Sequence, residues 1–288
     1  MQPPVEDTIC RMWTAVVWNM GLGSPPSRRA SKNWKRLDEL IREHSVDVAL
    51  LNEAPVTELA RRRAAYSTTG TEGWDLRRDN GRPRRRAWSA AVVSTDGEPT
   101  ELTPLAVGSS GRRPNVAFRP SKPGTWAAGL VEAPGIGRVS CVSMYGLMDE
   151  LSDASVHRSL SDISPVFTDP RYKRYVLVAG DLNSSTQWSR QDLRRRDENL
   201  LQRFEAYGLV DCLAKTRVEP LEGCTCQLGN SCRHSWTRHD PRHPKLQVDY
   251  LFASEDLVAR LNTCEALSPA DWLDYSDHAP ILATFRPS

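Results

Sequence analysis

The sequence predicts an α/β fold. Short apolar runs of strand length recur along the chain and end in polar residues, as in residues 175–179, which lead into Gly180 and Asp181. Amphipathic stretches of helical length lie between them, as in residues 31–45. With 288 residues, of which 39% are hydrophobic, the chain can bury a sizeable core and fits one large domain or two small ones.

Charge, hydropathy and cysteine content set limits on the functional class. The net charge is only +2, so any attraction to nucleic acid has to come from local clusters. Residues 1–11 lack the pattern of a signal peptide, and no run approaches the ~20 apolar residues of a membrane span. Seven cysteines, an odd number, favour reduced thiols or metal ligands over a disulfide framework. We therefore expect a cytoplasmic monomer that does not bind membranes.

The N-terminal part of the chain predicts a strand, a helix and a second strand. Residues 14–18 form an apolar run that leads into Asn19, and residues 46–51 form another that leads into Asn52 and Glu53. Between them, Ser31 can cap a helix that ends near residue 44. Its apolar positions are Trp34, Leu37, Leu40 and Ile41. Their helical spacing predicts that this face packs on the core.

An arginine-rich segment follows at about residues 61–86. It holds nine arginines against three acidic residues, and glycines interrupt any long regular structure. Guanidinium groups pair well with phosphate oxygens, and Trp74 and Trp88 offer faces on which bases can stack. The segment can equally be a solvated loop whose arginines aid solubility. The sequence leaves both interpretations open.

The middle of the chain predicts strands and one helix. Residues 88–94 read as a strand, with a hairpin partner around residues 100–107. Residues 125–132 and 137–145 form a second hairpin, whose last strand ends in Tyr145. A helix is expected over residues 152–163, and it carries His157.

The apolar run 175–179 is the most informative strand, because Asp181 and Asn183 follow it at once. In extended backbone, residues two apart point to the same side, so the carboxylate and the carboxamide leave the strand together. The pair can hold a water or a phosphate, or it can form an ordinary turn. A helix is expected over residues 191–207.

A cysteine- and histidine-rich insertion spans about residues 212–243. Its central residues have the spacing C-x-C-x5-C-x-H: Cys224, Cys226, Cys232 and His234. Three thiols and an imidazole can satisfy a tetrahedral Zn²⁺, although C-x-C is tighter than the usual ligand spacing. A zinc ion here would be structural, since the loop has little apolar area with which to fold itself. Alternatively, the cysteines are incidental, and His234 or His239 reaches into an active site.

Two polar clusters interrupt the apolar runs near the C-terminus. Residues 248–252 form an apolar run with Asp249 inside it, and Ser276, Asp277 and His278 precede the final run 281–285. Each has an ordinary structural explanation when taken alone. These clusters are informative because they continue the series of apolar runs that end in polar residues earlier in the chain.

Taken together, these motifs resemble the endonuclease/exonuclease/phosphatase superfamily, which includes deoxyribonuclease I, exonuclease III-type abasic-site endonucleases, sphingomyelinases and inositol-polyphosphate 5-phosphatases. The matching motifs are W-N-M-G at 18–21, L-L-N-E at 50–53, S-M-Y-G at 143–146, G-D-L-N at 180–183, V-D-Y-L at 248–251 and S-D-H-A-P at 276–280. The resemblance implies one domain over residues 1–288. It also implies a four-layer α/β sandwich, in which two mixed β-sheets pack face to face with helices outside, as in deoxyribonuclease I.

The resemblance also implies a catalytic Mg²⁺ or Mn²⁺ ion. Glu53 would be its principal ligand, with Asn19 and Asp277 close enough to assist. Carboxylate and carboxamide oxygens suit these hard cations, which also bind the substrate phosphate.

The remaining roles likewise follow from the resemblance. Asp181 would orient or deprotonate the attacking water, and Asn183 would hold that water or a phosphate oxygen. His278, oriented by Asp249, would donate to the phosphate. Tyr145 stands where the deoxyribonuclease I and sphingomyelinase branches have histidine and the abasic-site endonuclease branch has tyrosine. His157 is the alternative histidine.

We therefore expect a metal-dependent phosphodiesterase, and most plausibly a nuclease that acts on DNA. Trp236 would line its substrate groove, and His239 would contact phosphate. Two alternatives stay open at this point. One is a phosphoesterase of a small molecule, phospholipid or inositol phosphate, and the other is a non-catalytic module that binds nucleic acid.

Overall fold

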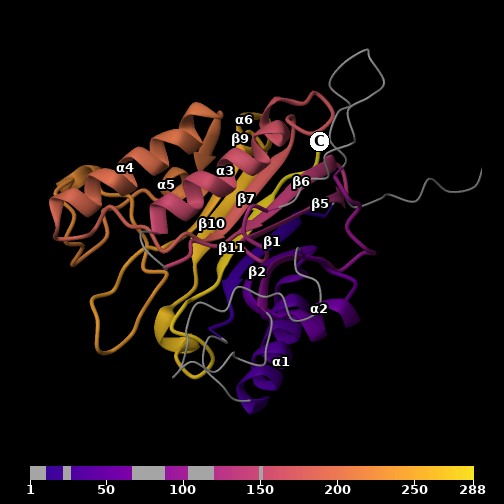
Figure 1. Ribbon diagram of the computed structural model, residues 1–288, viewed down its shortest axis with the longest axis horizontal. Helices are drawn as coiled ribbons and strands as arrows, with labels where there is room; N and C mark the ends of the chain where they lie inside the picture. The colour runs from indigo at the N-terminus through magenta and orange to yellow at the C-terminus, as the bar shows by residue number, and fades with distance from the viewer. Residues whose placement is uncertain (1–10, 22–26, 67–87, 103–119, 149–151) are drawn as a thin grey trace, which may run out of the picture.

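The computed structural model describes residues 11–21, 27–66, 88–102, 120–148 and 152–288. Its strands form two sheets (Figure 1). The first has the order β10 (Leu261–Ala266), β11 (Ile281–Phe285), β1 (Trp13–Asn19), β2 (Val48–Pro55), β4 (Trp88–Ser94) and β3 (Ala65–Tyr66). The second has the order β5 (Trp126–Ala133), β6 (Gly137–Met144), β7 (Val176–Asp181), β9 (Asp249–Ser254) and β8 (Leu209–Asp211). Both are mixed sheets, because β1 with β2 and β6 with β7 are parallel pairs and the other pairs are antiparallel.

Three long helices and several short ones connect the strands in the described residues. The long ones are α1 (Ser27–His44), α3 (Ser152–Thr168) and α4 (Gln191–Ala206). The short ones are α2 (Val56–Arg61), α5 (Cys212–Thr216), α6 (Glu255–Val258) and the 3₁₀ turns η1 (Gly229–Ser231) and η2 (Pro269–Trp272). None of the helices in the described parts of the chain has the length and apolar character needed to cross a membrane.

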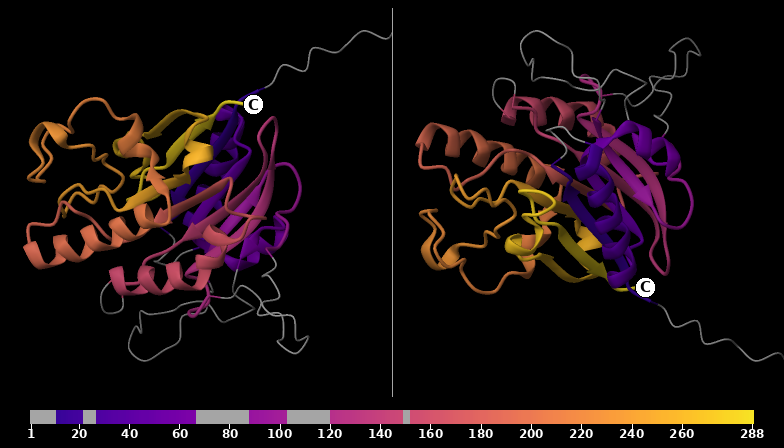
Figure 2. Two further views of the ribbon diagram at one scale, coloured as in Figure 1. Left: turned by 90° about the horizontal axis from the view of Figure 1, so that it is seen from above. Right: turned by 90° about the horizontal axis from the view of Figure 1, so that it is seen from below.

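The layers follow from the alternation of side chains along each strand, which places successive residues on opposite faces of the sheet. Val17 and Leu50 of the first sheet share one buried cluster with Leu177 and Leu251 of the second, so the sheets pack face to face. The opposite face of the first sheet packs on α1, where the predicted apolar side chains Trp34, Leu37 and Leu40 are buried. The opposite face of the second sheet packs on α3 and α4. Figure 2, right, shows α1 in indigo apart from α3 and α4 in pink and orange. The two separate clusters on the outer sheet faces confirm the predicted four-layer sandwich.

Functional side chains gather where strands of both sheets begin or end. Asn19 lies opposite Asn52 across the parallel β1–β2 pair, and Asp181 lies opposite Asp249 across the antiparallel β7–β9 pair. Asn19 ends β1, Asp181 ends β7 and Asp249 begins β9, whereas Asn52 lies within β2. One end of the sandwich therefore carries polar groups from both halves of the fold.

One predicted strand pairing is wrong. Residues 100–107 were expected to form a hairpin with residues 88–94, but β4 lies between β2 and β3, so both of its edges are occupied. Thr100 instead pairs with Leu130, next to β5. Residues 103–107, and residues 67–86 of the arginine-rich segment, lie outside the described residues.

Candidate active site

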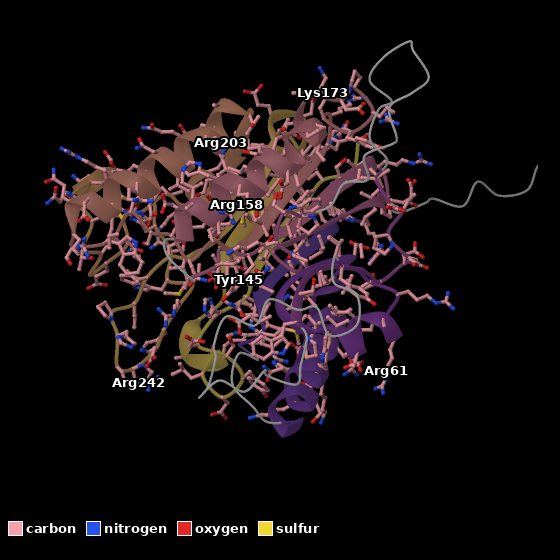
Figure 3. The ribbon with its side chains drawn as sticks, viewed as in Figure 1. Arg61, Tyr145, Arg158, Lys173, Arg203 and Arg242 are labelled. Carbon is pink, nitrogen blue, oxygen red and sulfur yellow. The ribbon has the colours of Figure 1, made fainter. Side chains whose placement is uncertain are left out.

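A cavity of about 550 Å³ lies at the end of the sandwich where the polar strand ends meet. Its lining includes Glu53, Tyr145, Asp181, Asn183 and His278, all of which the sequence indicated. Tyr145, labelled in Figure 3, comes from the loop after β6 in the second sheet. Glu53 belongs to the first sheet, so the cavity joins the two halves.

Two glycines let the backbone segments around this cavity approach closely. A Cβ on Gly180, whose φ is +145°, would lie 2.0 Å from the carbonyl oxygen of Met144. A Cβ on Gly146 would lie 1.9 Å from the carbonyl oxygen of Leu182. Since side-chain carbons do not come so close to backbone, both positions require glycine.

Asn52 connects the two sheets beneath the cavity. Its side chain is fully buried, and its Oδ1 accepts a hydrogen bond of 2.7 Å from the backbone N–H of Asp181. Its Nδ2 donates to Ser143 Oγ and to the carbonyl of Met144. The Asn52 amide therefore fixes the position of the Asp181 backbone relative to β2 and β6.

Glu53 is aimed into the cavity by an irregularity in its strand. The β2–β4 register shifts between Leu51 and Ala54, and Glu53 adopts a φ of +50°. Such a bulge redirects a side chain, and a positive φ in a residue other than glycine is often found at functional sites. The Tyr145 hydroxyl donates to Glu53 Oε1 at 3.0 Å, and Asn19 Nδ2 lies 3.4 Å from the same oxygen.

Asp181 is held by several donors and is 1% exposed. Asn19 Nδ2 donates to its Oδ2 at 2.7 Å, and Asn183 donates from its backbone N–H at 2.8 Å and from its Nδ2 at 3.1 Å. Burial raises the pKa of Asp181 to about 7, although the charge of His278 beside it acts in the opposite direction. A carboxyl group with this pKa can exchange a proton at neutral pH.

His278 and Asp249 form a buried pair. His278 Nδ1 lies 2.8 Å from Asp249 Oδ2, and His278 Nε2 lies 3.8 Å from Asp181 Oδ2. Thr237 Oγ1 accepts from the Asp249 backbone N–H, whereas Asp249 Oδ1 has no hydrogen-bond partner within the described residues. Burial alone would lower the pKa of His278, but the carboxylates of Asp249, Asp181 and Asp277 outweigh it and raise this pKa to about 10. The imidazole is therefore cationic at neutral pH.

Tyr145 remains a hydrogen-bond donor under the same conditions. Burial, reinforced by the negative charges of Glu53 and Asp181, raises the pKa of Tyr145 well above its ordinary value. Its hydroxyl therefore keeps its proton and shares it with Glu53.

The donor set of the cavity fits a hard divalent cation. The carboxylates of Glu53 and Asp181 both contact the amide nitrogen of Asn19, which places two negative oxygen groups side by side at the cavity. Mg²⁺ and Mn²⁺ prefer such oxygen ligands. Asp277 also lines the cavity, and its Oδ2 accepts from Arg238 Nε at 3.1 Å.

Asn19 is oriented differently from what the sequence suggested. Its Oδ1 accepts from the backbone N–H of Gly21 at 2.9 Å, so its amide nitrogen, not its oxygen, is turned towards the two carboxylates. In this arrangement Asn19 positions Glu53 and Asp181 and offers no oxygen to a cation.

No family model and no curated protein sequence matches the chain. Solved structures do. An endonuclease/exonuclease/phosphatase from Bacteroides vulgatus has a TM-score of 0.62 at 16% identity, over 96% of this chain and 100% of the other. An AP endonuclease from Archaeoglobus fulgidus has a TM-score of 0.56 at 17% identity, over 95% and 99%. A 3′ phosphatase from Neisseria, bound to a product DNA hairpin, has a TM-score of 0.58 at 15% identity, over 95% and 99%.

The chain has the fold of the endonuclease/exonuclease/phosphatase superfamily. The sequence resemblance is thus confirmed at the level of fold. Within this fold, the motif residues at both sheet ends converge on one cavity, as their positions at strand ends predicted.

Residues 238–243 form one wall of this cavity. His239 belongs to this wall, as predicted, and its buried Nδ1 has no hydrogen-bond partner among the described residues. Arg242, labelled in Figure 3, pairs with Asp240 at 2.9 Å and is 82% exposed. The wall therefore brings cationic and imidazole groups to the opening of an acidic site.

Two aromatic or imidazole residues lie away from this cavity. Trp236 was expected to line the substrate groove. It instead lines a second hollow of about 510 Å³ beside α5 and β10, outside the lining of the candidate active site. His157 lies on α3, where Arg203 donates to its carbonyl oxygen at 2.7 Å. It is not part of the cavity lining, which makes it unsuitable as a substitute for His278.

Sequence reasoning gave no role to several supporting residues. The sequence placed Asn52 only after an apolar run and did not single out Thr237, yet they hold the backbone of Asp181 and Asp249. Ser276 accepts from the His278 backbone N–H and donates to the Asn19 carbonyl. Their polar side chains beside apolar runs were the available signal, but their partners lie on other strands.

Proposed function

We propose that the chain is a divalent-metal-dependent phosphodiesterase that cleaves nucleic acid, with DNA as the preferred substrate. The observation that carries this proposal is the convergence of carboxylates and an imidazole from both sheets on one cavity. Glu53 and Asp181 both contact the Asn19 amide nitrogen there, and His278 Nε2 lies 3.8 Å from Asp181 Oδ2.

Hydrolysis of a phosphodiester needs a base for water and positive charge for the developing phosphorane. The pKa of Asp181, about 7, suits proton acceptance at neutral pH, whereas the pKa of His278, about 10, keeps the imidazole charged. We therefore assign water activation to Asp181 and phosphate stabilisation to His278 Nε2. Asn183, whose backbone and side chain both contact Asp181, holds the carboxylate in place.

The cation would be held by the Glu53 carboxylate, next to Asp181, since both carboxylates contact the Asn19 amide nitrogen; Asp277 lines the same cavity. When bound, Mg²⁺ or Mn²⁺ would neutralise charge on the phosphate and lower the pKa of water. Tyr145 and Asn19 hold the Glu53 carboxylate from two sides and so position it for this purpose.

The substrate assignment rests on the cavity wall and on the structural neighbours. Arg238, His239, Arg242 and His243 place cations and imidazoles beside the acidic groups, as a polyanionic strand requires. Among proteins of this fold, one is an AP endonuclease and one is a 3′ phosphatase with bound DNA product. A nucleic acid substrate is consistent with both observations.

The test is a cleavage assay on supercoiled plasmid, single-stranded DNA, an abasic duplex and RNA, with Mg²⁺, Mn²⁺ or excess chelator. The wild type is compared with Glu53→Ala and Asp181→Asn, and with two matched controls at exposed positions, Glu132→Ala and Asp192→Asn. We expect metal-dependent cutting that both site variants lose and both controls keep.

Two results would contradict the proposal. If no polymer is cut but bis(p-nitrophenyl) phosphate is hydrolysed in a metal- and Asp181-dependent manner, the chain is a small-substrate phosphoesterase. If neither reaction occurs while nucleic acid is bound, the chain is a non-catalytic module.

A further inference from the structure

Residues 217–234, which follow α5, fold with almost no apolar core of their own. Within residues 217–234, all of which are described, only Cys232 and His234 are buried. Val218 is 77% exposed and Leu228 is 56% exposed, and the one regular element is the turn η1. A segment that buries so little apolar surface needs another source of stability to hold one conformation.

Four metal-binding side chains meet inside this segment. The ligand atoms of Cys224, Cys226, Cys232 and His234 all lie within 4.8 Å of one another. His234 Nδ1 is 3.5 Å from Cys224 Sγ and 3.4 Å from Cys232 Sγ. A tetrahedral zinc site with bonds of about 2.3 Å to sulfur and about 2.0 Å to nitrogen has sulfur–nitrogen edges of about 3.5 Å. The observed separations match those edges.

Neighbouring side chains prepare these ligands for a cation. Thr186 Oγ1 lies 2.7 Å from His234 Nε2. The hydroxyl can accept the ring proton's hydrogen bond from Nε2, and in that tautomer the Nδ1 lone pair faces the thiols. Gln187 Nε2 donates to Cys224 Sγ at 3.1 Å, a contact of the kind that a metal-bound sulfur accepts from its surroundings. Such outer contacts are typical of metal-bound histidine and cysteine.

We propose that Cys224, Cys226, Cys232 and His234 bind one structural Zn²⁺ ion. Three sulfur donors and one nitrogen donor in a tetrahedron favour Zn²⁺ over the oxygen-seeking cations of the catalytic cavity. Four protein ligands leave no position for water or substrate, so the site stabilises the fold and does not perform chemistry. The proposal does not depend on the function assigned to the cavity.

The zinc site connects the exposed segment to both strands that carry catalytic side chains. Thr186 and Gln187 follow Asp181 and Asn183 in the chain, and Gln187 Oε1 accepts from the Gln247 backbone N–H at 2.6 Å. Gln247 lies two residues before Asp249, and its Oε1 accepts from the Ser235 N–H at 2.8 Å. The metal would therefore hold the loop after β7 against the start of β9.

The test is metal analysis of the full chain purified without added metal or chelator. We expect about one zinc per chain in the wild type, and less than a tenth of that in Cys226→Ser and Cys232→Ser. Cys264→Ala is the matched control, because Cys264 is buried elsewhere in the fold and its loss should leave the zinc content unchanged. In addition, the wild type is stripped of metal and titrated with Co²⁺.

The cobalt titration keeps the proposal testable if the cysteine variants do not fold. We expect the visible bands of tetrahedral cobalt and a near-ultraviolet thiolate charge-transfer band, both saturating at about one Co²⁺ per chain and reversed by Zn²⁺. Folded wild type that contains no zinc and gives no such bands would overturn the proposal. So would mass-spectrometric detection of a disulfide within the quartet in freshly purified protein, or zinc retained by both cysteine variants.

Discussion

At the scale of single residues, the pairing of His278 with Asp249 accounts for the charge of the imidazole. Replacing Asp249 with asparagine removes the buried carboxylate that lies 2.8 Å from Nδ1 and leaves His278 free to adopt the wrong tautomer or to lose its proton. We predict that Asp249→Asn lowers kcat for phosphodiester cleavage by about 100-fold or more, with a much smaller change in KM. Steady-state kinetics would measure both.

The control for this substitution is Asp256→Asn, because Asp256 lies on α6 just after β9 and is exposed. Its kinetics should match the wild type. Equal losses in kcat for the two variants, or a loss in Asp249→Asn confined to KM, would contradict the role given to the pair.

The backbone beneath the cavity leads to a second prediction at this scale. Gly146→Ala would force a methyl group to within 1.9 Å of the Leu182 carbonyl oxygen, and backbone must move to relieve it. We predict a loss of about 3 kcal/mol in the free energy of unfolding, measured by denaturant titration. Gly208→Ala is the control, since Gly208 has a φ of +74° but open space around it, and it should lose only about 1 kcal/mol. A larger loss at Gly208 than at Gly146 would show that conformational strain, not the close approach, is decisive.

Sequence patterns indicated which residues reach the cavity, but not how they are oriented. Glu53 and Asp181 follow apolar runs, and a residue after a buried strand lies at a sheet end whatever its partners. The turn of the Asn19 amide and the bulge at Glu53 depend on contacts with other strands. The sequence of one strand alone therefore predicts neither the orientation of the Asn19 amide nor the bulge at Glu53.

At the scale of elements, α4 fastens the loop that carries Asn183. Asp197 Oδ2 accepts from the Ser185 backbone N–H and from Trp188 Nε1, each at 2.7 Å. Burial raises the pKa of Asp197 to about 6, despite these donors. Because an unfolded aspartate has a pKa near 3.9, the folded chain binds more protons at this residue between about pH 4 and pH 6.

The sign of the pH effect follows from this difference in proton binding. The contribution of Asp197 to stability is complete below pH 4 and is lost as the pH rises through about 6. We predict that the free energy of unfolding of the wild type, taken relative to Asp197→Asn, falls by about 1 to 2 kcal/mol from pH 4 to pH 7. Urea titrations at each pH would measure it, and an increase over that range would contradict the prediction.

The long periodic elements were predictable, and the short ones were not. The apolar face of α1 and the β5–β6 hairpin follow from helical and alternating patterns, and the structure has both. The partner of β4 was missed because β3 has only two residues, too few to produce a pattern. The cysteine spacing identified a zinc candidate, but only the packed positions of Thr186 and Gln187 bring further support.

At the scale of the whole molecule, the two sheets share one interior core but contribute different groups to the cavity. The first sheet provides Glu53, positioned by Asn19, and the second provides Asp181, while Asp249 of the second sheet contacts His278 from beneath the lining. The motif order along the chain predicted the sandwich, since those motifs belong to strands of both sheets. The sequence did not predict which basic groups surround the cavity. Arginine is abundant throughout the chain, and many arginine side chains pair with nearby acidic residues.

With a net charge of only +2, the proposed binding of DNA would depend on local cations such as Arg242. If Arg242 contacts a phosphate, its removal should weaken binding of all sequences and reduce the dependence of log K on log salt by about one unit. We predict this for Arg242→Ala in the Asp181→Asn background, which prevents cutting, by fluorescence anisotropy with a labelled duplex at 50 to 200 mM salt. Arg138→Ala is the matched control, because Arg138 is also exposed and also paired with an acid, Glu132, but on the β5–β6 hairpin. Its salt dependence should equal that of the parent, and an equal decrease in both variants would mean that general charge, not the cavity wall, attracts the substrate.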